Sequence, residues 1–367
     1  MDRVKIGLVG SGFAAALHME AYKQVYGIEP WVAAVASPSE RAGDFAREYG
    51  IPSVYRGMEE MIRKERPDVV DICSPPSLHA PMIGSAMGAG CHVICEKPLT
   101  GWFGDSAEPD MAKKVMEQLE QLRRVVERSG RKFFYAENFI YAPAVQKSAS
   151  LIRAAGEHIL FMRGEESHSG SHAGHAALWS MNGGGSLIRQ GCHPLSALLY
   201  LKQLENGKGA KAVGVTADMG YIVPTLNEEE RKNIQARPKD VEDLANVILT
   251  FEDGTKALIT AGDMILGGVR NEIQVYTTGG VYQCRIAPSD QMTTYHVEDE
   301  KLSGQYFTEK VETKKGWQSI FLCEDMARGY VGELRDFLLC AAGRKGEPES
   351  GFSLAYDTVR IIYGAYC

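Results

Sequence analysis

Two side chains in this chain of 367 residues occur where proton-transfer chemistry would need them. Lys97 follows an apolar run, residues 91–94, that predicts a β-strand, and it lies between Glu96 and Pro98. Burying an ammonium is costly unless it is paired, so a lysine here indicates either a salt bridge with Glu96 at the strand end or a functional role. Open α/β sheets bind ligands at the carboxyl ends of their strands, which is where Lys97 would lie.

His193 is the second candidate for proton transfer. It follows Gly183-Gly184-Gly185 and lies in the first turns of a predicted helix. The glycines allow close approach of the backbone, and the unperturbed pKa of histidine lies near working pH. Lys97 and His193 are therefore the two candidates for proton transfer.

Three more histidines precede this helix, and their spacing raises the question of a metal site. His168, His172 and His175 would share one side of a helix, but Gly170 and Gly174 make a helix unfavourable there. The His-Glu-x-x-His motif of metal hydrolases is also missing from the sequence. We predict no metal, and substrate-binding roles for His172 and His175. Trp179 can stack on a sugar or anchor the loop in the core.

A nucleotide-binding signature begins the chain. An apolar run at residues 4–9 precedes Gly10-Ser11-Gly12-Phe13-Ala14-Ala15, and a helical stretch follows. This G-x-G-x-x-A pattern lets the backbone approach a pyrophosphate at a helix N-terminus. The next strand ends at Ser37 and not at an acid; its hydroxyl can meet a ribose or a 2′-phosphate, and Arg41 can neutralise that phosphate. The choice between NAD and NADP therefore stays open.

Further strands and helices alternate up to residue 137, which predicts a parallel, doubly wound Rossmann sheet. The loop at residues 74–79 and the turn at Glu96 then lie at the carboxyl edge, facing the cofactor crevice. His79 can alternatively cap the following helix. The predicted cofactor contacts are Gly10, Gly12, Phe13, Ala14, Ser37, Arg41, Ser74, Pro75, Pro76, Leu78, His79, Glu96 and Lys97.

The second half predicts an α+β domain with an open, mostly antiparallel sheet. Strand-like runs occur at residues 159–165, 212–219, 244–251, 256–261, 272–276, 281–286 and 293–297. A hairpin signal at residues 252–255 joins two of them. One sheet face should pack on helices, and the other is free for a subunit interface. A helix is expected at residues 322–342, and a charged, exposed segment at 224–241. The expected division is a Rossmann domain at 1–137, a substrate and oligomerisation domain at 138–352, and a C-terminal helix at 353–367.

The N-terminal pattern resembles the Gfo/Idh/MocA oxidoreductase family. The resemblance rests on the G-x-G-x-x-A turn, the proline-containing loop with His79, and Glu96-Lys97-Pro98. It implies that Lys97 contacts substrate and assists proton transfer, that His193 is the base, and that the protein is a homo-oligomer. The family's orienting aspartate is Arg189 here, and a second acid is Ser196.

These departures leave three possibilities for the proton chemistry. Glu165 or Glu166 takes over the orienting role, His193 works unaided, or Lys97 is the main acid–base group. Arg189 would favour a neutral lysine and can clamp a substrate carboxylate. The segment at residues 99–110 also departs from the family, as a lid, an oligomer contact or a surface insertion.

Composition narrows the class of protein. The net charge of −7 argues against binding to nucleic acid, and no apolar run reaches the length of a membrane span. The chain enters its first strand at once, so no signal peptide is expected. Eight scattered cysteines without a C-x-x-C pair predict a reducing, cytoplasmic setting without disulfides.

We therefore predict an NAD(P)-dependent oxidoreductase acting on a CH–OH group of a sugar, cyclitol or glycoside, with the 3-hydroxyl of a glycoside as a narrower option. The candidates for holding this carbohydrate-like substrate are Asn138, Tyr141, His172, His175, Trp179 and Arg189. Two alternatives remain: a redox-neutral, NAD-dependent glycosidase or lyase, and a non-catalytic nucleotide-binding sensor.

Overall fold

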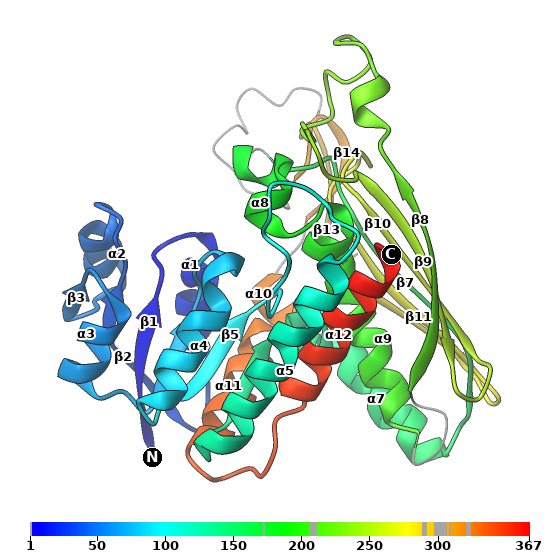
Figure 1. Ribbon diagram of the computed structural model, residues 1–367. Helices are drawn as coiled ribbons and strands as arrows, with labels where there is room; N and C mark the ends of the chain where they lie inside the picture. The colour runs from blue at the N-terminus through cyan, green and yellow to red at the C-terminus, as the bar shows by residue number, and fades with distance from the viewer. Residues whose placement is uncertain are drawn as a thin grey trace. The chain divides into compact units, whose positions relative to one another are not determined.

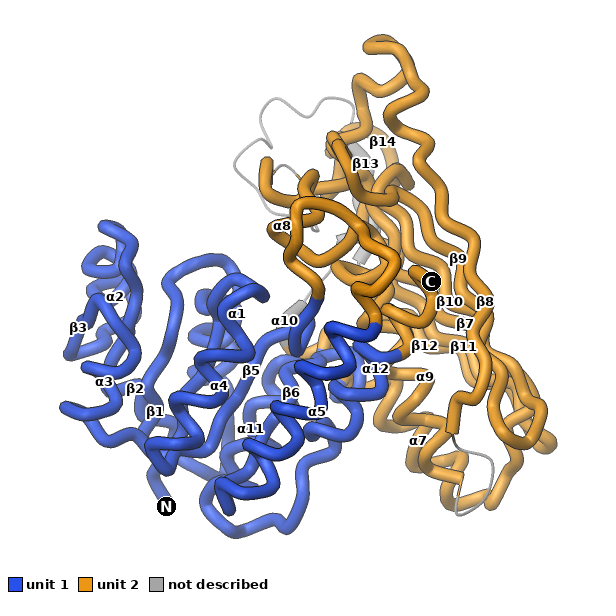
Figure 2. Tube along the Cα trace, viewed as in Figure 1, with its two compact units in different colours: residues 1–101, 113–141, 329–360 blue, residues 102–112, 142–328, 361–367 orange. Residues whose placement is uncertain are grey.

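The computed structural model describes residues 2–171, 173–205, 211–287, 292–296, 307, 310–320 and 324–367 (Figure 1). Contacts within the chain define two compact units (Figure 2). Unit 1 contains residues 1–101, 113–141 and 329–360, and unit 2 contains residues 102–112, 142–328 and 361–367. The chain thus returns to unit 1 after unit 2, which differs from the expected division at residues 137 and 352.

Unit 1 contains a six-stranded sheet in the order β3-β2-β1-β4-β5-β6, and every neighbouring pair is parallel. The strands are β1 (Arg3–Val9), β2 (Glu29–Ala36), β3 (Ser53–Tyr55), β4 (Val69–Ile72), β5 (His92–Glu96) and β6 (Phe133–Ala136). All residues of the central strand β4 are buried, as expected of a parallel strand covered on both faces, and all residues of β6 at the end of the sheet are buried too. The strand order reverses between β1 and β4, and this is where doubly wound sheets bind ligands.

The helices of unit 1 either connect its successive parallel strands or follow the last of them, β6. These are α1 (Phe13–Tyr22), α2 (Ala42–Tyr49), α3 (Met58–Glu65), α4 (His79–Gly88), α5 (Met111–Ser129), α6 (Asn138–Tyr141), α11 (Tyr330–Ala341) and α12 (Phe352–Ala365), of which α5 and α12 extend into unit 2. Helix α11 packs against α1, so a late segment of the chain completes the core of the first unit. The predicted Rossmann architecture is confirmed.

Unit 2 contains a second six-stranded sheet in the order β12-β11-β7-β10-β9-β8. The strands are β7 (Ile159–Ser167), β8 (Ala212–Gly220), β9 (Leu244–Phe251), β10 (Lys256–Gly262), β11 (Arg270–Thr277) and β12 (Val281–Ala287). Only the pairing of β7 with β10 is parallel among these described strands. The sheet is therefore mixed and mostly antiparallel, which confirms the predicted second domain.

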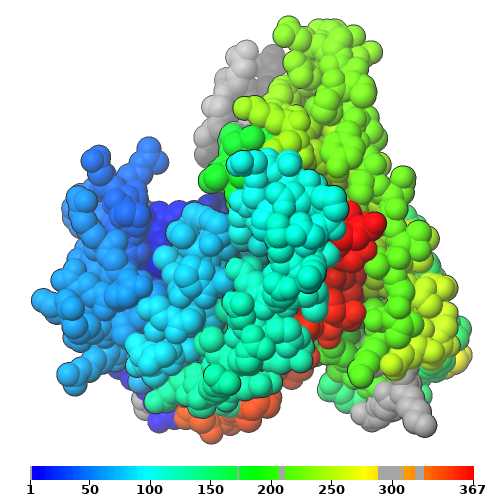
Figure 3. Space-filling model, viewed as in Figure 1, coloured from blue at the N-terminus to red at the C-terminus, as the bar shows by residue number. Residues whose placement is uncertain are grey.

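Alternation along the strands of unit 2 separates a packed face from an open one. In β9, residues 245, 247, 249 and 251 are buried, whereas Ile248 is 46% exposed. The helices that pack on the sheet are α7 (Pro143–Ala155) and α9 (Cys192–Gln203). Residues 224–241 are mostly exposed, as expected for a charged loop, and they form the yellow-green surface at the top of Figure 3.

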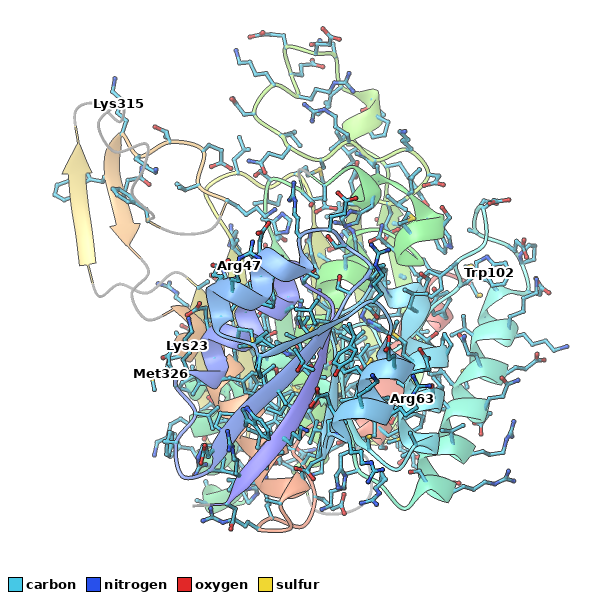
Figure 4. All side chains as sticks on the ribbon, turned by 90° about the vertical axis from the view of Figure 1, so that its left-hand side faces the viewer. Lys23, Arg47, Arg63, Trp102, Lys315 and Met326 are labelled. Carbon is cyan, nitrogen blue, oxygen red and sulfur yellow. The ribbon has the colours of Figure 1, made fainter. Side chains whose placement is uncertain are left out.

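Two expectations about the last third of the chain are wrong. The predicted helix at residues 322–342 is two helices in its described part, α10 (Glu324–Ala327) and α11, because Gly329 adopts a φ of +100° between them. The sequence analysis also missed β14 (Gly316–Ile320), which pairs with β13 (Met292–His296) in a two-stranded sheet next to Lys315 (Figure 4).

Among the described helices, none combines the length and the apolar character that crossing a membrane would require. The seven described cysteines (Cys73, Cys91, Cys95, Cys192, Cys284, Cys340 and Cys367) are free thiols.

Candidate active site

The glycine turn after β1 has the geometry that a pyrophosphate needs. Gly10 has a φ of +108°, and a Cβ at this position would lie 2.5 Å from the Cys73 carbonyl oxygen, so only glycine fits. Gly12 precedes α1, and no side chain among the described residues caps this helix. A Cβ built on Gly12 would meet open space. The first N–H groups of α1 are therefore available to an anion, which fits the cofactor.

The end of β2 carries hydroxyl groups and not a carboxylate. The Ser37 hydroxyl lies 3.0 Å from the Ser11 hydroxyl and accepts a hydrogen bond from the Ser39 N–H. Arg41 is exposed, and its backbone N–H donates to the Ser39 hydroxyl. Within residues 37–41, which the structure describes in full, the one acid is Glu40, and it is exposed. The carboxylate that would repel a 2′-phosphate at the end of β2 is therefore replaced by Ser37.

His79 fastens the loop at residues 74–79 to the turn after β5. Its imidazole is fully buried, with Nδ1 2.8 Å from the Pro98 carbonyl oxygen and Nε2 2.9 Å from the Ser74 carbonyl oxygen. Helix α4 begins at His79 and has no side-chain cap within the described structure, so the capping alternative is wrong. Ser74 and Pro76 are partly buried, while Pro75 and Leu78 are exposed; their contact with a cofactor stays a prediction.

Strand β5 ends at Glu96, and a cis peptide bond joins Lys97 to Pro98. The Lys97 N–H donates to Glu96 Oε2 over 3.0 Å, and Glu96 Oε1 lies 3.2 Å from Nε2 of His18. Burial alone would raise the pKa of Glu96, but the hydrogen bond and charge of His18, with the charge of Lys97, lower it below its usual value. Glu96 is therefore a carboxylate that faces His18, which makes the turn more than a surface salt bridge.

Asn138 and Tyr141 lie in α6, and both are buried within unit 1. The Tyr141 hydroxyl donates to Asp336 Oδ2 over 2.8 Å and accepts from the Ser350 N–H over 3.0 Å. This hydroxyl is therefore engaged inside the unit, which favours a structural role for Tyr141 over the predicted contact with substrate.

In unit 2, Gly183, Gly184 and Gly185 form a turn whose N–H groups bind the Glu242 carboxylate. The Gly185 and Leu187 N–H groups donate to the Glu242 carboxylate over 2.8 and 2.9 Å, and the Tyr366 hydroxyl donates over 2.8 Å. A Cβ on Gly185 would lie 2.0 Å from the Glu242 carbonyl oxygen, so the turn requires glycine. Burial raises the pKa of Glu242, although these hydrogen bonds act in the opposite direction.

A π-helical turn, η3 (Leu187–Gly191), connects this glycine turn to α9, where His193 is the second residue. Such turns inside α-helices occur frequently at functional sites. His193 is 7% exposed. The site residue predicted from sequence thus lies at a local irregularity that the sequence analysis did not predict.

Arg189 projects from this turn and pairs with Asp263, the residue that follows β10. Gln190 also donates to the Asp263 carboxylate, and Nδ1 of His168 lies 3.8 Å from it. The sequence analysis missed Asp263 as a carboxylate near position 189. Glu165, one of its alternatives, instead lies 3.5 Å from Arg270. The roles of Glu166 and of an unaided His193 stay predictions.

The remaining histidines differ in burial. His168 is buried, and its Nδ1 accepts a hydrogen bond from the Gly170 N–H over 2.9 Å. His175 is exposed, and His172 lies outside the described residues. The substrate-binding roles of His172 and His175 therefore stay predictions.

Trp179 anchors its loop in the core. Its side chain is 1% exposed, and its indole N–H donates to the Trp102 carbonyl oxygen over 3.0 Å. Its ring also contacts Tyr366 edge to face. A buried ring has no face available for a sugar, so the second of the two sequence-based interpretations is correct, and the predicted stacking is not.

The segment at residues 102–110 contacts the glycine turn at residues 183–185. The Tyr363 hydroxyl accepts from the Trp102 N–H over 2.5 Å and donates to the Gly183 carbonyl oxygen over 2.7 Å. Figure 4 shows Trp102 on the segment that leads into α5. This departure from the family pattern is thus built into unit 2 next to the turn that leads to His193.

Two family profiles match most of the chain. The profile described as an oxidoreductase family with an NAD-binding Rossmann fold matches residues 4–128, and the profile of the GFO/IDH/MocA C-terminal domain matches residues 158–283. The chain belongs to the Gfo/Idh/MocA oxidoreductase family. Its N-terminal domain is therefore an NAD-binding Rossmann domain.

Relatives and solved structures agree with this assignment. The chain is 31% identical to the D-glucoside 3-dehydrogenase of Escherichia coli (strain K12), over 34% of this chain and 33% of the relative. It is 31% identical to an inositol 2-dehydrogenase of Rubrobacter xylanophilus, over 44% of this chain and 43% of the relative. The chain thus spans less than half the length of these curated relatives.

Among solved structures, the chain resembles GenD2 from gentamicin A biosynthesis in complex with NAD. The TM-score is 0.80 and the identity 21%, and the match covers 100% of this chain and 94% of that one. At this identity the likeness shows a shared fold.

Proposed function

We propose that the protein is an NAD-dependent dehydrogenase that oxidises a secondary alcohol of a sugar, cyclitol or glycoside, or reduces the corresponding ketone. The observation that supports this most is the sheet edge of unit 1, where the uncapped N-terminus of α1 and the Glu96-Lys97 turn follow the carboxyl ends of β1 and β5. Ser37 allows the 2′-phosphate of NADP, so both nucleotides belong in the assay.

The protein's part in this reaction is to bind, orient and move a proton. A bound NAD would supply the acceptor for the hydride of the carbinol carbon. We infer that His193 takes the hydroxyl proton, and that the ammonium or amine of Lys97 contacts substrate and assists proton transfer. Glu242 and the glycine turn hold the start of α9, and Asp263 fixes Arg189 next to it.

A carbohydrate-like substrate is supported by the polar character of unit 2 around Arg189 and by the names of the relatives. Arg189, Asp263, Arg237 and Ser171 line a small pocket. Such a pocket offers charged and hydroxyl groups to a polyhydroxylated or carboxylated ligand. The residues that we propose to hold substrate in unit 2 are His172, His175 and Arg189.

Within this class we favour the 3-hydroxyl of a glycoside, in line with the relative named D-glucoside 3-dehydrogenase. A ketone at C3 acidifies the C–H bond at C2. Elimination of the C1 substituent can then follow, here or in a partner enzyme, without a further oxidant.

The test is to incubate the purified protein with NAD or NADP and a panel of sugars, cyclitols and glycosides, recording absorbance at 340 nm and products by mass spectrometry. We expect NADH to rise with an equivalent amount of a keto product. Glycoside cleavage without net formation of NADH would contradict the dehydrogenase and support the redox-neutral glycosidase or lyase. Nucleotide binding without any turnover would favour the sensor.

A further inference from the structure

A buried histidine joins two strands of the Rossmann sheet and contacts the glutamate that precedes Lys97. His18 lies on α1, and its Nδ1 is 2.8 Å from Asp71 Oδ2 in β4. Its Nε2 is 3.2 Å from Glu96 Oε1 at the end of β5. The side chains of His18 and Asp71 are fully buried, and that of Glu96 is 13% exposed. The three residues form a continuous acid–histidine–acid chain inside unit 1.

The chemistry of this chain requires a charged histidine. A neutral imidazole has one N–H and one lone pair, so one of the two carboxylates would face a lone pair. An imidazolium donates from Nδ1 to Asp71 and pairs its positive charge with Glu96, which lies 3.2 Å from Nε2. Burial, the largest single effect, would lower the pKa of His18, but the charge and hydrogen bond of Asp71, together with Cys73, raise it well above the usual value. Geometry and electrostatics therefore agree on an imidazolium.

The other groups that face His18 do not supply the positive charge that Asp71 and Glu96 require. Tyr22 on α1 donates to the same oxygen of Asp71 over 2.8 Å, and the Cys73 sulfur lies 3.5 Å from His18 Nδ1. Burial raises the pKa of Cys73 far above its usual value, so this thiol is neutral. From α11, Glu333 faces His18, Glu96, Glu137 and Asp71.

Burial keeps the Glu333 carboxyl group protonated. It is fully buried, its carboxyl oxygens have no hydrogen-bond partner within the described structure, and burial raises its pKa well above the usual range. As a neutral acid it adds no charge next to His18. The imidazolium therefore offsets the carboxylates of Asp71 and Glu96.

We propose that His18 is a positioning residue for Lys97. It holds the Glu96 carboxylate between its own Nε2 and the Lys97 N–H, and so fixes both the backbone of the Glu96-Lys97 turn and the negative charge beside the lysine. The proposal that this serves hydroxyl oxidation rests on the proposed function. The link from His18 through Glu96 to Lys97 does not.

The chain offers a test variant and two matched controls. His18→Gln removes the charge but keeps a polar side chain on α1. Tyr22→Phe removes a hydrogen bond to the same oxygen of Asp71 from the same helix and leaves the link to Glu96 intact. Glu333→Gln replaces a neutral acid with a neutral amide of the same shape. A purely structural role for this cluster would affect His18→Gln and Tyr22→Phe alike.

The experiment measures how the reactivity of the Lys97 amine depends on pH, and it needs no enzymatic turnover. Each folded variant is labelled with acetic anhydride across a pH range, and acetylation of Lys97 is followed by peptide mass spectrometry. We expect the pH midpoint of labelling to fall in His18→Gln, because the lysine loses its fixed anionic neighbour, and to stay unchanged in both controls. Nitrogen NMR of histidine-labelled protein should show both ring nitrogens of His18 protonated at neutral pH.

Activity measurements then distinguish the positioning role of His18 from the proposed dehydrogenase reaction. With the substrate found in the panel, His18→Gln should lose on the order of 10- to 100-fold in kcat/KM and shift the pH profile, as expected for a displaced catalytic group. An unchanged labelling midpoint in a folded His18→Gln protein, or a neutral His18, would overturn the positioning role. Absence of wild-type turnover with a shifted midpoint would instead overturn the proposed reaction and leave the link standing.

Discussion

At the scale of single residues, the proposal depends most on Lys97. It is partly buried at the end of β5, beside a carboxylate that His18 holds. Its side chain therefore lies at the edge of the NAD-binding sheet with an anionic neighbour. This placement suits an amine that orients a hydroxyl and shares its proton.

Replacing Lys97 with Met should lower kcat by about 100-fold or more, because a group that assists proton transfer contributes 10²–10⁴-fold. The dissociation constant of NAD, measured by fluorescence titration, should change little. Lys97→Arg keeps the charge with a different shape and should recover binding of substrate better than turnover. A Lys97→Met enzyme with wild-type kcat would exclude the lysine from the chemistry.

Arg189 gives a second prediction, about selectivity. Its pairing with Asp263 positions a guanidinium at a small pocket, where it can meet a carboxylate in a two-pronged hydrogen bond. We expect Arg189→Ala to reduce the preference for a carboxylated sugar over its neutral counterpart by about 10-fold, in kcat/KM ratios. Arg189→Lys is the matched control. An unchanged ratio would assign Arg189 to the support of Asp263 alone.

The sequence predicted the types of most of these residues but not their partners. The G-x-G-x-x-A turn and Glu96-Lys97-Pro98 are local patterns, and they lie where expected. Glu242 and Asp263 each act on residues more than fifty positions earlier in the chain. Both carboxylates lie at a strand boundary, beside β9 and β10, which is the only signal that could have marked them.

At the scale of elements, the glycine turn and η3 determine where α9 begins. The Glu242 carboxylate satisfies two N–H groups of the turn, and Tyr366 supplies a third hydrogen bond from the C-terminal end of the chain. Segments 102–112, 142–328 and 361–367 therefore cooperate at this one turn. Its order should govern both stability and activity.

Glu242→Ala should reduce the free energy of unfolding by about 1–3 kcal/mol, because it leaves buried N–H groups without acceptors. Tyr366→Phe, which removes one hydrogen bond and leaves the carboxylate in place, should cost about 1 kcal/mol. Urea unfolding of both single variants and the double variant gives the coupling between them. Additive effects would contradict a shared network at the turn.

Most elements were predictable because parallel strands are continuous apolar runs and strands at an open face alternate. The failures have local causes. Gly329 breaks a helix that the apolar pattern continues through, and η3 shifts the helical register by one residue within a buried segment. Neither changes the hydrophobic pattern from which helices are predicted.

At the scale of the whole molecule, an ion cluster in unit 2 should make stability depend on pH. Lys202 is fully buried, and its Nζ pairs with Glu205 and lies 2.7 Å from Asp253. Burial alone would raise the pKa of Asp253, but hydrogen bonds from Lys202 and Thr255 lower it to about 2. The lowered pKa means that the folded state favours the carboxylate, so this stabilisation is present at neutral pH and is lost as the pH falls from about 4 to about 2.

Asp253→Asn should therefore reduce the free energy of unfolding at pH 7 by about 1 kcal/mol, after allowance for solvent screening. The difference from the wild-type protein should shrink as the pH approaches 2. Urea unfolding across this range measures it, and Glu252→Gln, at the exposed neighbouring position, is the control. A constant difference at every pH would contradict the assigned pKa.

The central claim is that hydride passes directly from a carbinol carbon to NAD on this protein. The most direct measurement uses NAD with fully deuterated glucose, inositol and glucoside, followed by mass spectrometry of the reduced nucleotide. The account predicts NADH that carries deuterium, together with a keto product, and loss of both in Lys97→Met and His193→Asn. Reduced nucleotide without deuterium, or none with any of these substrates, would contradict it.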